Sequence, residues 1–305
     1  MKYRTLGSTG LNVSVVGVGT WQFGGEWGRS YEQREADAIL GRARELGINL
    51  IDTAECYGDH LSESLIGPAI RSNRSEWVLA TKFGHHFHRP FERTDEFGPA
   101  DVVRQLEQSL RALQTDYVDL YQFHSGPDAA FDSDTLWDAL NRQVEVGKIR
   151  HLGISIGSNR NVHQTSRATA VGAEAIQVVY NRLDRAPEEA VFPSCVEQRL
   201  GVLARVPLAS GFLSGKYKPG DRFGSDDVRS RRDADEQDRL LREVEEIGRS
   251  EVPEGTDMAA WALAWCLRHP AVTTVIPGCK DVAQVEANAA AVALVQDGHP
   301  QDVRA

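Results

Sequence analysis

The sequence has few cysteines and no long hydrophobic run. Its four cysteines, at positions 56, 195, 266 and 279, are scattered and form no CxxC or zinc-finger spacing, so we expect reduced thiols and no metal site. No apolar run is long enough to span a bilayer, and Met1–Gly7 lacks the apolar segment of a signal peptide. These absences favour a cytoplasmic protein with no membrane partner.

The chain also lacks an excess of basic residues. It carries 34 Lys and Arg against 44 Asp and Glu, a formal net charge of −10 over 305 residues, which argues against nucleic acid as a partner. The remaining composition, 41% hydrophobic and 26% charged, is ordinary for a globular protein. Any anionic ligand would therefore need a local cluster of cations.

Strand and helix patterns alternate along most of the chain. The strand patterns lie at 15–19, 48–51, 77–81, 117–123, 150–155, 175–180, 201–206 and 272–276. The helical patterns lie at 31–46, 61–72, 99–113, 134–146, 159–171, 187–199, 256–269 and 281–293. Eight such units in about 250–300 residues predict an α/β fold, a closed (β/α)8 TIM barrel. An open doubly wound sheet is the second choice, because no GxGxxG turn follows the first strand.

Two segments depart from this alternation. Residues 1–14 resemble a short β-hairpin with a turn at 7–10. Residues 215–237 are charged, contain Gly and Pro, and show no apolar period. A loop this long in a compact domain is usually functional, so we expect a mobile lid after the seventh strand. No linker or repeat interrupts the chain, which we interpret as one domain over 1–305.

Three successive strand patterns end in chemically active side chains. The second strand ends at Asp52, the third at Lys82 and the fourth at His124, with Tyr57 in an intervening loop. Barrel active sites lie at these strand ends. A lysine beside the phenol is expected to lower the pKa of Tyr57, with Asp52 orienting Lys82 and His124 donating to a substrate oxygen. This is a general-acid site for a developing alkoxide, and it needs an external reductant.

These residues resemble the aldo-keto reductases, nicotinamide-dependent (β/α)8 oxidoreductases. The resemblance extends over nearly the whole chain, through Gly19–Trp21, Asp52–Gly58, Ala80–Phe83, Asp119–His124, Gly147–Ser155, Ile176–Asn181, Pro207–Lys216 and Ile276–Lys280. It implies that Asp52, Tyr57, Lys82 and His124 are catalytic. It also implies that the substrate is a small carbonyl or alcohol compound.

The resemblance further implies a cofactor site. Ser155 and Gln177 would hold the nicotinamide carboxamide, and the stretch from Pro207 to Lys216 would wrap the pyrophosphate. Lys280, Gln284 and Asn288 would hold the adenosine end, where a cation suits the 2′-phosphate of NADP, so NADP is favoured over NAD. The full set of expected contacts is Gly19, Thr20, Trp21, Ser155, Gln177, Arg205, Pro207, Leu208, Ser210, Gly211, Leu213, Gly215, Lys216, Gly278, Lys280, Gln284 and Asn288.

Some positions depart from the family pattern. Ile156 stands where many members have Asn, and Ala287 where Glu is frequent. Arg205 occupies the position of a tyrosine that stacks on the nicotinamide, and a planar guanidinium also stacks on rings. The chain ends soon after its last helix, so the substrate pocket would be open or closed by 215–237 or by a second copy in a homo-oligomer.

Other interpretations remain open at this point. Asp52 and Lys82 alone would more often be a structural ion pair. The histidines at 85, 86 and 88 invite a metal site, but they follow the third strand in an expected loop without defined partners. Cys56 is either a packing residue or a redox-sensitive thiol. The rival functions are a nucleotide-binding regulatory subunit with little turnover and a Schiff-base lyase or isomerase using Lys82.

Overall fold

The computed structural model describes residues 1–303. Eight parallel strands form one curled sheet in the order β12-β11-β10-β9-β8-β5-β4-β3. The strands are β3 (Val18–Gly19), β4 (Leu50–Asp52), β5 (Val78–Phe83), β8 (Val118–His124), β9 (Ile149–Ser155), β10 (Ala173–Val179), β11 (Gly201–Arg205) and β12 (Thr274–Val275). Parallel bridges between Val16 and Val275 and between Gly19 and Gly278 join the two ends of this sheet. The predicted (β/α)8 barrel is thereby confirmed.

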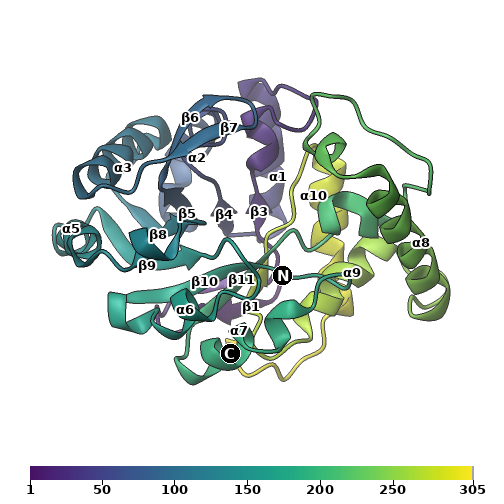
Figure 1. The fold of residues 1–305 in the computed structure, drawn as a ribbon. Helices are drawn as coiled ribbons and strands as arrows, with labels where there is room; N and C mark the ends of the chain where they lie inside the picture. Colours follow the sequence, from purple (N-terminus) through teal and green to yellow (C-terminus); the bar gives the residue numbers. More distant parts are fainter. Residues whose placement is uncertain (304–305) are drawn as a thin grey trace.

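Helices surround the strands on the outside (Figure 1). The α-helices are α1 (Gln33–Glu45), α2 (Leu61–Ile70), α3 (Pro99–Leu113), α4 (Asp128–Phe131), α5 (Asp134–Glu145), α6 (Val162–Ser166), α7 (Val191–Glu197), α8 (Ala234–Ser250), α9 (Met258–Leu267) and α10 (Val282–Ala290). Asp233, Asp257 and Asp281 cap α8, α9 and α10, since each side chain accepts a hydrogen bond from a first-turn backbone N–H. Within the described part of the chain, no helix is both long and apolar enough to cross a membrane.

The core has two layers. The larger layer packs strands against helices, and a smaller one fills the barrel interior with side chains such as Leu50, Leu120, Leu203 and Ile276. Leu6, on the predicted N-terminal hairpin of β1 (Tyr3–Thr5) and β2 (Asn12–Ser14), belongs to the inner layer. The hairpin therefore contributes to the barrel core, and it packs tightly on β11, because a Cβ added to Gly201 would lie 2.5 Å from the Leu6 side chain.

Two elements differ from the expected pattern. The histidine-containing loop is a second hairpin, β6 (His85–Arg89) and β7 (Glu92–Asp95), which lies at the rim of the barrel (Figure 1). Helix α8 was not predicted, and its first turn falls within the segment 215–237, which also contains a short 3-10 turn at Val228–Arg231. Charged residues hide the alternation of the short hairpin strands. In α8, however, the buried Leu241, Val244 and Ile247 recur at helical spacing, so this helix could have been predicted from the sequence.

Candidate active site

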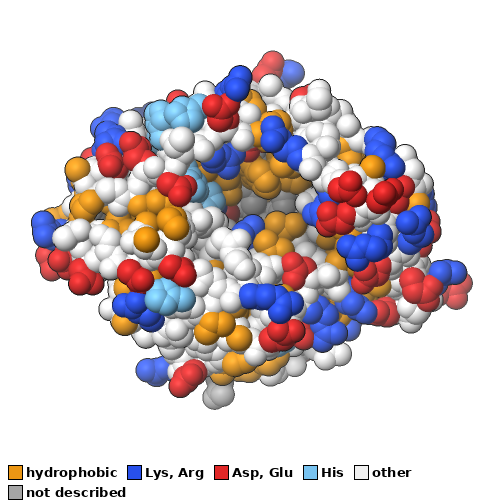
Figure 2. All heavy atoms as spheres, in the orientation of Figure 1, with side chains coloured by type: hydrophobic (Ala, Val, Ile, Leu, Met, Phe, Trp, Pro, Cys, Tyr) orange, Lys and Arg blue, Asp and Glu red, His pale blue; other side chains and the backbone are white. Residues whose placement is uncertain are grey.

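A cavity of about 600 Å³ opens at the C-terminal ends of the strands. The hollow holds hydrophobic side chains and is bordered by Lys and Arg (Figure 2). Its lining contains all the predicted catalytic and cofactor residues except Lys82, Ser155, Leu213 and Gly215. Lys82, Ser155 and Leu213 are almost fully buried and lie behind the lining. The barrel therefore brings the predicted strand-end residues to one cavity.

Lys82 organises the predicted catalytic group. Its Nζ donates to Asp52 Oδ2 at 2.9 Å, to the backbone oxygen of Thr53 at 2.7 Å and to Tyr57 OH at 3.2 Å. An ammonium has three donors, so every N–H of this fully buried group has a partner. The salt bridge and the strand ends thus hold the phenol at the cavity wall.

The pKa of Tyr57 differs from the sequence-based expectation. Burial raises the pKa of this phenol to about 12, although the charge of Lys82 acts to lower it. Burial also acts to lower the pKa of Lys82, but Asp52 and Tyr57 outweigh it and the pKa of Lys82 is raised. The expected net lowering of the Tyr57 pKa was therefore wrong for this structure. Near neutral pH the phenol carries its proton and Lys82 is charged.

His124 is a neutral imidazole beside Tyr57. Burial and the nearby cation of Lys82 place its pKa well below the ordinary value. The Tyr57 and His124 rings lie with centroids 6.1 Å apart, and Cys56 Sγ lies 3.6 Å from His124 Nδ1. A thiol proton donated to Nδ1 leaves the ring proton on Nε2. In that tautomer the imidazole is a hydrogen-bond donor through Nε2.

Two glutamines complete the surroundings of Asp52. Gln177 Nε2 donates to Asp52 Oδ1 at 2.6 Å, and Gln122 Nε2 donates to the same oxygen at 3.3 Å. Ser155 Oγ donates to Gln177 Oε1 at 3.3 Å, from behind the cavity wall. Gln122 was missed, because it lies inside the strand motif rather than at its end. This network fixes Asp52 and, through it, Lys82.

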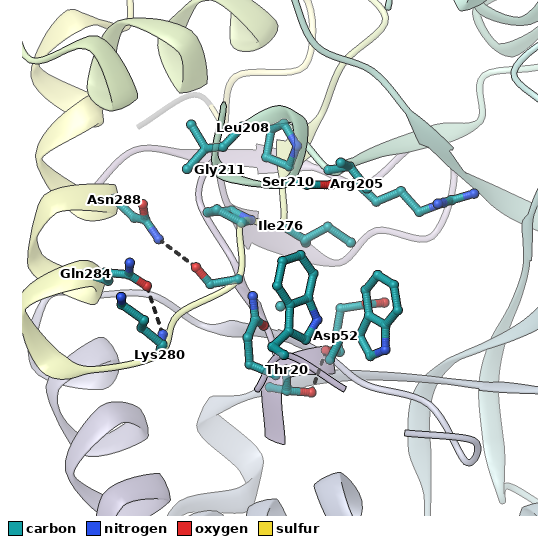
Figure 3. A pocket seen from close by; sticks show the side chains of 18 of the residues that line it. Thr20, Asp52, Arg205, Leu208, Ser210, Gly211, Ile276, Lys280, Gln284 and Asn288 are labelled. Carbon is teal, nitrogen blue, oxygen red and sulfur yellow. Dashed lines mark hydrogen bonds between the residues drawn. The ribbon is translucent and has the colours of Figure 1, made fainter. Parts of the chain in front are cut away.

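The predicted cofactor residues lie along two sides of the cavity. Lys280 lies just before α10, Gln284 and Asn288 lie on that helix, and Leu208, Ser210 and Gly211 lie on the turn after β11 (Figure 3). The Gln284 side chain accepts from the Lys280 backbone N–H at 3.0 Å. Positive φ angles at Val206, Ala209, Ser210 and Gly211 show that this turn is held in a conformation that costs energy, as is common at ligand sites.

Several lining residues were not predicted. Arg29 approaches Lys280, where its Nη1 donates to the Lys280 backbone oxygen at 3.1 Å. Arg93 reaches the cavity from β7 and is bound by the buried Glu26 at 2.5 Å. The remainder are Gln22, Trp27, Tyr31, Ser125, Val206, Ser214, Tyr217, Arg229, Asp257, Ala259, Ile276, Pro277 and Ala287. Most of them lie in loops without a periodic pattern.

The segment 215–237 lies against the loop that follows β3. Val228 N donates to Glu26 O at 3.1 Å, and Gly28 N donates to Asp226 O at 3.1 Å. Arg229 stacks on Phe223 at 3.8 Å and pairs with Asp227 at 2.6 Å. Figure 1 shows the segment as the long green loop beside α8. Tyr217 and Arg229 from this segment line the cavity.

Glu55 is a buried carboxyl group next to His124. Its Oε1 accepts from His85 N at 3.1 Å, while burial and the neighbouring Glu63 raise its pKa to about 7. Since the pKa is raised from an ordinary 4.5, the stability that this group contributes is present below pH 4.5 and is lost as pH rises through about 7.

We therefore expect Glu55→Gln to gain stability relative to the wild type as pH rises. The gain between about pH 4.5 and pH 8 should reach about 3 kcal/mol, because the amide does not become charged. Urea unfolding of both proteins at the two pH values measures it. A difference in unfolding free energy that is the same at both pH values would contradict a buried, titrating Glu55.

Comparison with known proteins places these features in a family. The aldo/keto reductase family model matches residues 15–300. The chain is 32% identical to the aldo-keto reductase YhdN of Bacillus subtilis, over 94% of this chain and 87% of that protein. It is 30% identical to a probable voltage-gated potassium channel subunit beta of Arabidopsis thaliana, over 97% of this chain and 92% of the relative.

A solved structure agrees with this placement. The holo form of the aldo-keto reductase AKR11C1 from Bacillus halodurans superimposes with a TM-score of 0.79 at 34% identity, covering 96% of this chain and 91% of that one. The family consists of oxidoreductases that act on carbonyl groups with nicotinamide cofactors. With its barrel, its strand-end cluster and a match over nearly its full length, this chain belongs to the aldo/keto reductase family.

Proposed function

We propose that the protein is an NADPH-dependent carbonyl reductase in which Tyr57 is the general acid. The observation that carries this proposal is the contact of Tyr57 OH with the buried Lys82, 3.2 Å away, at the wall of the cavity. The same site would oxidise the alcohol in the reverse direction. The substrate is an aldehyde, a ketone or a sugar in its carbonyl form.

The residues of the cavity suit a dinucleotide. Gly278 leaves room for the Gln22 amide, because a Cβ added there would lie 1.8 Å from Gln22 Nε2 and would displace that side chain. The strained turn at 206–211 lines this side of the cavity and would hold the phosphates. Lys216 lies on the same side, and Lys280 with Arg29 supplies cations at the other end. When bound there, the cofactor supplies the hydride.

The protein's own groups then handle the oxygen and the proton. His124, as a neutral donor, orients the carbonyl oxygen. Tyr57 transfers its proton to that oxygen as negative charge develops on it, and Lys82 stabilises the resulting phenolate. Asp52 keeps Lys82 charged, because the nearby carboxylate raises the pKa of the ammonium. Trp21, stacked on Tyr57 with centroids 6.0 Å apart, excludes water from this step.

The other residues at the nicotinamide end are proposed to act with these groups. Gln177 holds the carboxamide, and Ser155 supports it from behind the wall through its bond to Gln177 Oε1. Arg205 stacks on the ring in place of the family's tyrosine. Arg205 Nη2 donates to the Ile156 backbone oxygen at 3.2 Å, which sets the plane of the guanidinium. The segment 215–237 is proposed to open and close as a lid, because it contributes Tyr217 and Arg229 to the cavity.

The reaction is tested by following NADPH consumption with a panel of aldehydes, ketones and sugars. Turnover with NADPH that exceeds turnover with NADH supports both the reaction and the cofactor. Tight NADPH binding without turnover over the panel would favour the second candidate, a regulatory subunit. The potassium-channel beta-subunit name of one relative is the observation behind that alternative.

Lys280→Met tests the cofactor preference. Removing a cation from a phosphate costs about 1.5–3 kcal/mol, so KM for NADPH should rise roughly tenfold or more, with little change for NADH. Lys216→Met is the matched variant, because a contact with the pyrophosphate is shared by both cofactors and its loss should weaken both equally. An equal effect of Lys280→Met on the two cofactors would contradict the assignment of Lys280 to the 2′-phosphate.

A further inference from the structure

Three side chains with metal-binding atoms meet beside the catalytic tyrosine. They are Glu55 and Cys56, in the loop after β4, and His124 at the end of β8, and their candidate ligand atoms all lie within 4.8 Å of one another. Cys56 Sγ lies 3.6 Å from His124 Nδ1, which is 3.9 Å from Glu55 Oε2. The cluster is not visible in the sequence, because 68 positions separate Cys56 from His124.

One carboxylate oxygen in this cluster has no hydrogen-bond partner within residues 1–303. Glu55 is 3% exposed and Cys56 is fully buried. Glu55 Oε1 accepts from the backbone of His85, but Oε2 has no hydrogen-bond partner among the described residues. A buried polar atom without a partner is costly and needs an explanation. This oxygen lies 3.9 Å from the ring nitrogen that would share a metal with it.

Two of the three spacings between these atoms suit zinc. Zinc bonds of about 2.0–2.3 Å in a tetrahedron place neighbouring ligand atoms roughly 3.3–3.8 Å apart. The 3.6 Å between sulfur and nitrogen falls in this range, and the 3.9 Å between nitrogen and oxygen is close to it. Thiolate and imidazole ligands favour zinc-like cations over magnesium or calcium. His124 lines the cavity, which provides a path of entry.

We propose that Glu55, Cys56 and His124 form an inhibitory site for a zinc-like divalent cation. Binding forms a metal–sulfur bond, and the thiol proton leaves to solvent without any redox change. The cation then occupies His124 Nδ1 and adds positive charge beside Tyr57. Inhibition rests on the proposed reductase function, whereas binding of the cation does not.

The surroundings make this a weak, reversible site. The cations of Lys82 and Arg93 act electrostatically on Cys56, and they oppose a further positive charge. The affinity is therefore lower than that of a structural zinc site, where the metal supports the fold. A site of this kind responds to a rise in free metal concentration without being permanently loaded.

Cobalt(II) titration of the purified, metal-free protein tests binding without any turnover. Wild type and Cys195→Ala, a control for a buried thiol in α7, should show the near-ultraviolet absorption of a cobalt–thiolate bond. Cys56→Ala should lack the band, and Glu55→Gln should bind at least about tenfold more weakly, since even outer-shell changes cost 10–100-fold. Absence of the band in wild type, or its persistence in Cys56→Ala, would overturn the site. Cobalt bound without this band, as at the exposed His86 and His88, would overturn it too.

Zinc inhibition of NADPH turnover tests the consequence. Zinc should inhibit wild type and Cys195→Ala equally, and a chelator should restore activity. Cys56→Ala should need at least about tenfold more zinc for half inhibition of its own activity. Equal sensitivity of Cys56→Ala would overturn the inhibitory role. A Cys56-dependent cobalt band in a protein that turns over no carbonyl would support the site and count against the reductase function.

Discussion

Tyr57→Phe is expected to lower turnover by about 10²–10⁴-fold while leaving NADPH affinity nearly unchanged. A positioned general acid contributes a factor of this size, and the substitution removes only the hydroxyl that Lys82 contacts at 3.2 Å. The aromatic ring remains, so the stacking against Trp21 persists. Steady-state kinetics with an accepted carbonyl substrate measure kcat, and fluorescence titration with NADPH measures the affinity.

Tyr121→Phe is the matched control for this substitution. Tyr121 is a fully buried tyrosine in the middle of β8, and its OH donates to the Val102 backbone oxygen at 3.3 Å and lies outside the cavity. Loss of the Tyr121 hydroxyl should leave kcat within a few-fold of the wild-type value. Wild-type turnover in a folded Tyr57→Phe protein would rule out Tyr57 as the acid.

Lys82→Met is expected to abolish most turnover and to destabilise the fold by about 3–5 kcal/mol. Removing one partner of a buried ion pair leaves the other charge without compensation, and Asp52 is only 4% exposed. Two glutamine amides still donate to Asp52, so the protein should still fold. Denaturant unfolding measures the loss of stability, and cofactor titration shows whether the cavity persists.

A second substitution separates the structural role of the pair from its catalytic role. Asp52→Asn removes the charge that Lys82→Met leaves unpaired, so the double variant should be less destabilised than the sum of the single variants. It should not recover turnover, because the phenol still lacks its cation. If Lys82→Met alone proved as stable as wild type, the burial of this pair would be contradicted.

The clustering of the strand-end residues was predictable because each member has a clear place in the pattern. Asp52, Lys82 and His124 follow apolar runs, and the closure of a parallel barrel brings such strand ends together. The effect of burial on the pKa of Tyr57 was not predictable in the same way. The charge of Lys82 beside Tyr57 suggested a lowered pKa, whereas the folded protein excludes enough water to raise the pKa to about 12.

Contacts between loops that are distant in the sequence could not be predicted either. Arg93 meets Glu26 across 67 positions, and neither residue lies in a recurring pattern. Arg29 reaches the Lys280 backbone across 251 positions. The hairpin β6–β7 was taken for a loop because histidines and charged residues hide its alternation. These contacts depend on how the barrel closes, and they shape the cavity mouth where substrate preference is decided.

Hydride transfer from the cofactor to a carbonyl carbon is the central step of this account. The most direct test uses NADPH deuterated at the transferable position of the nicotinamide, with wild-type protein and an accepted aldehyde, and mass spectrometry of the alcohol product. The account predicts one deuterium at the former carbonyl carbon, formed far more slowly by Tyr57→Phe. Product without deuterium, or NADPH that stays bound and unoxidised over the whole panel, would contradict the assignment as a reductase.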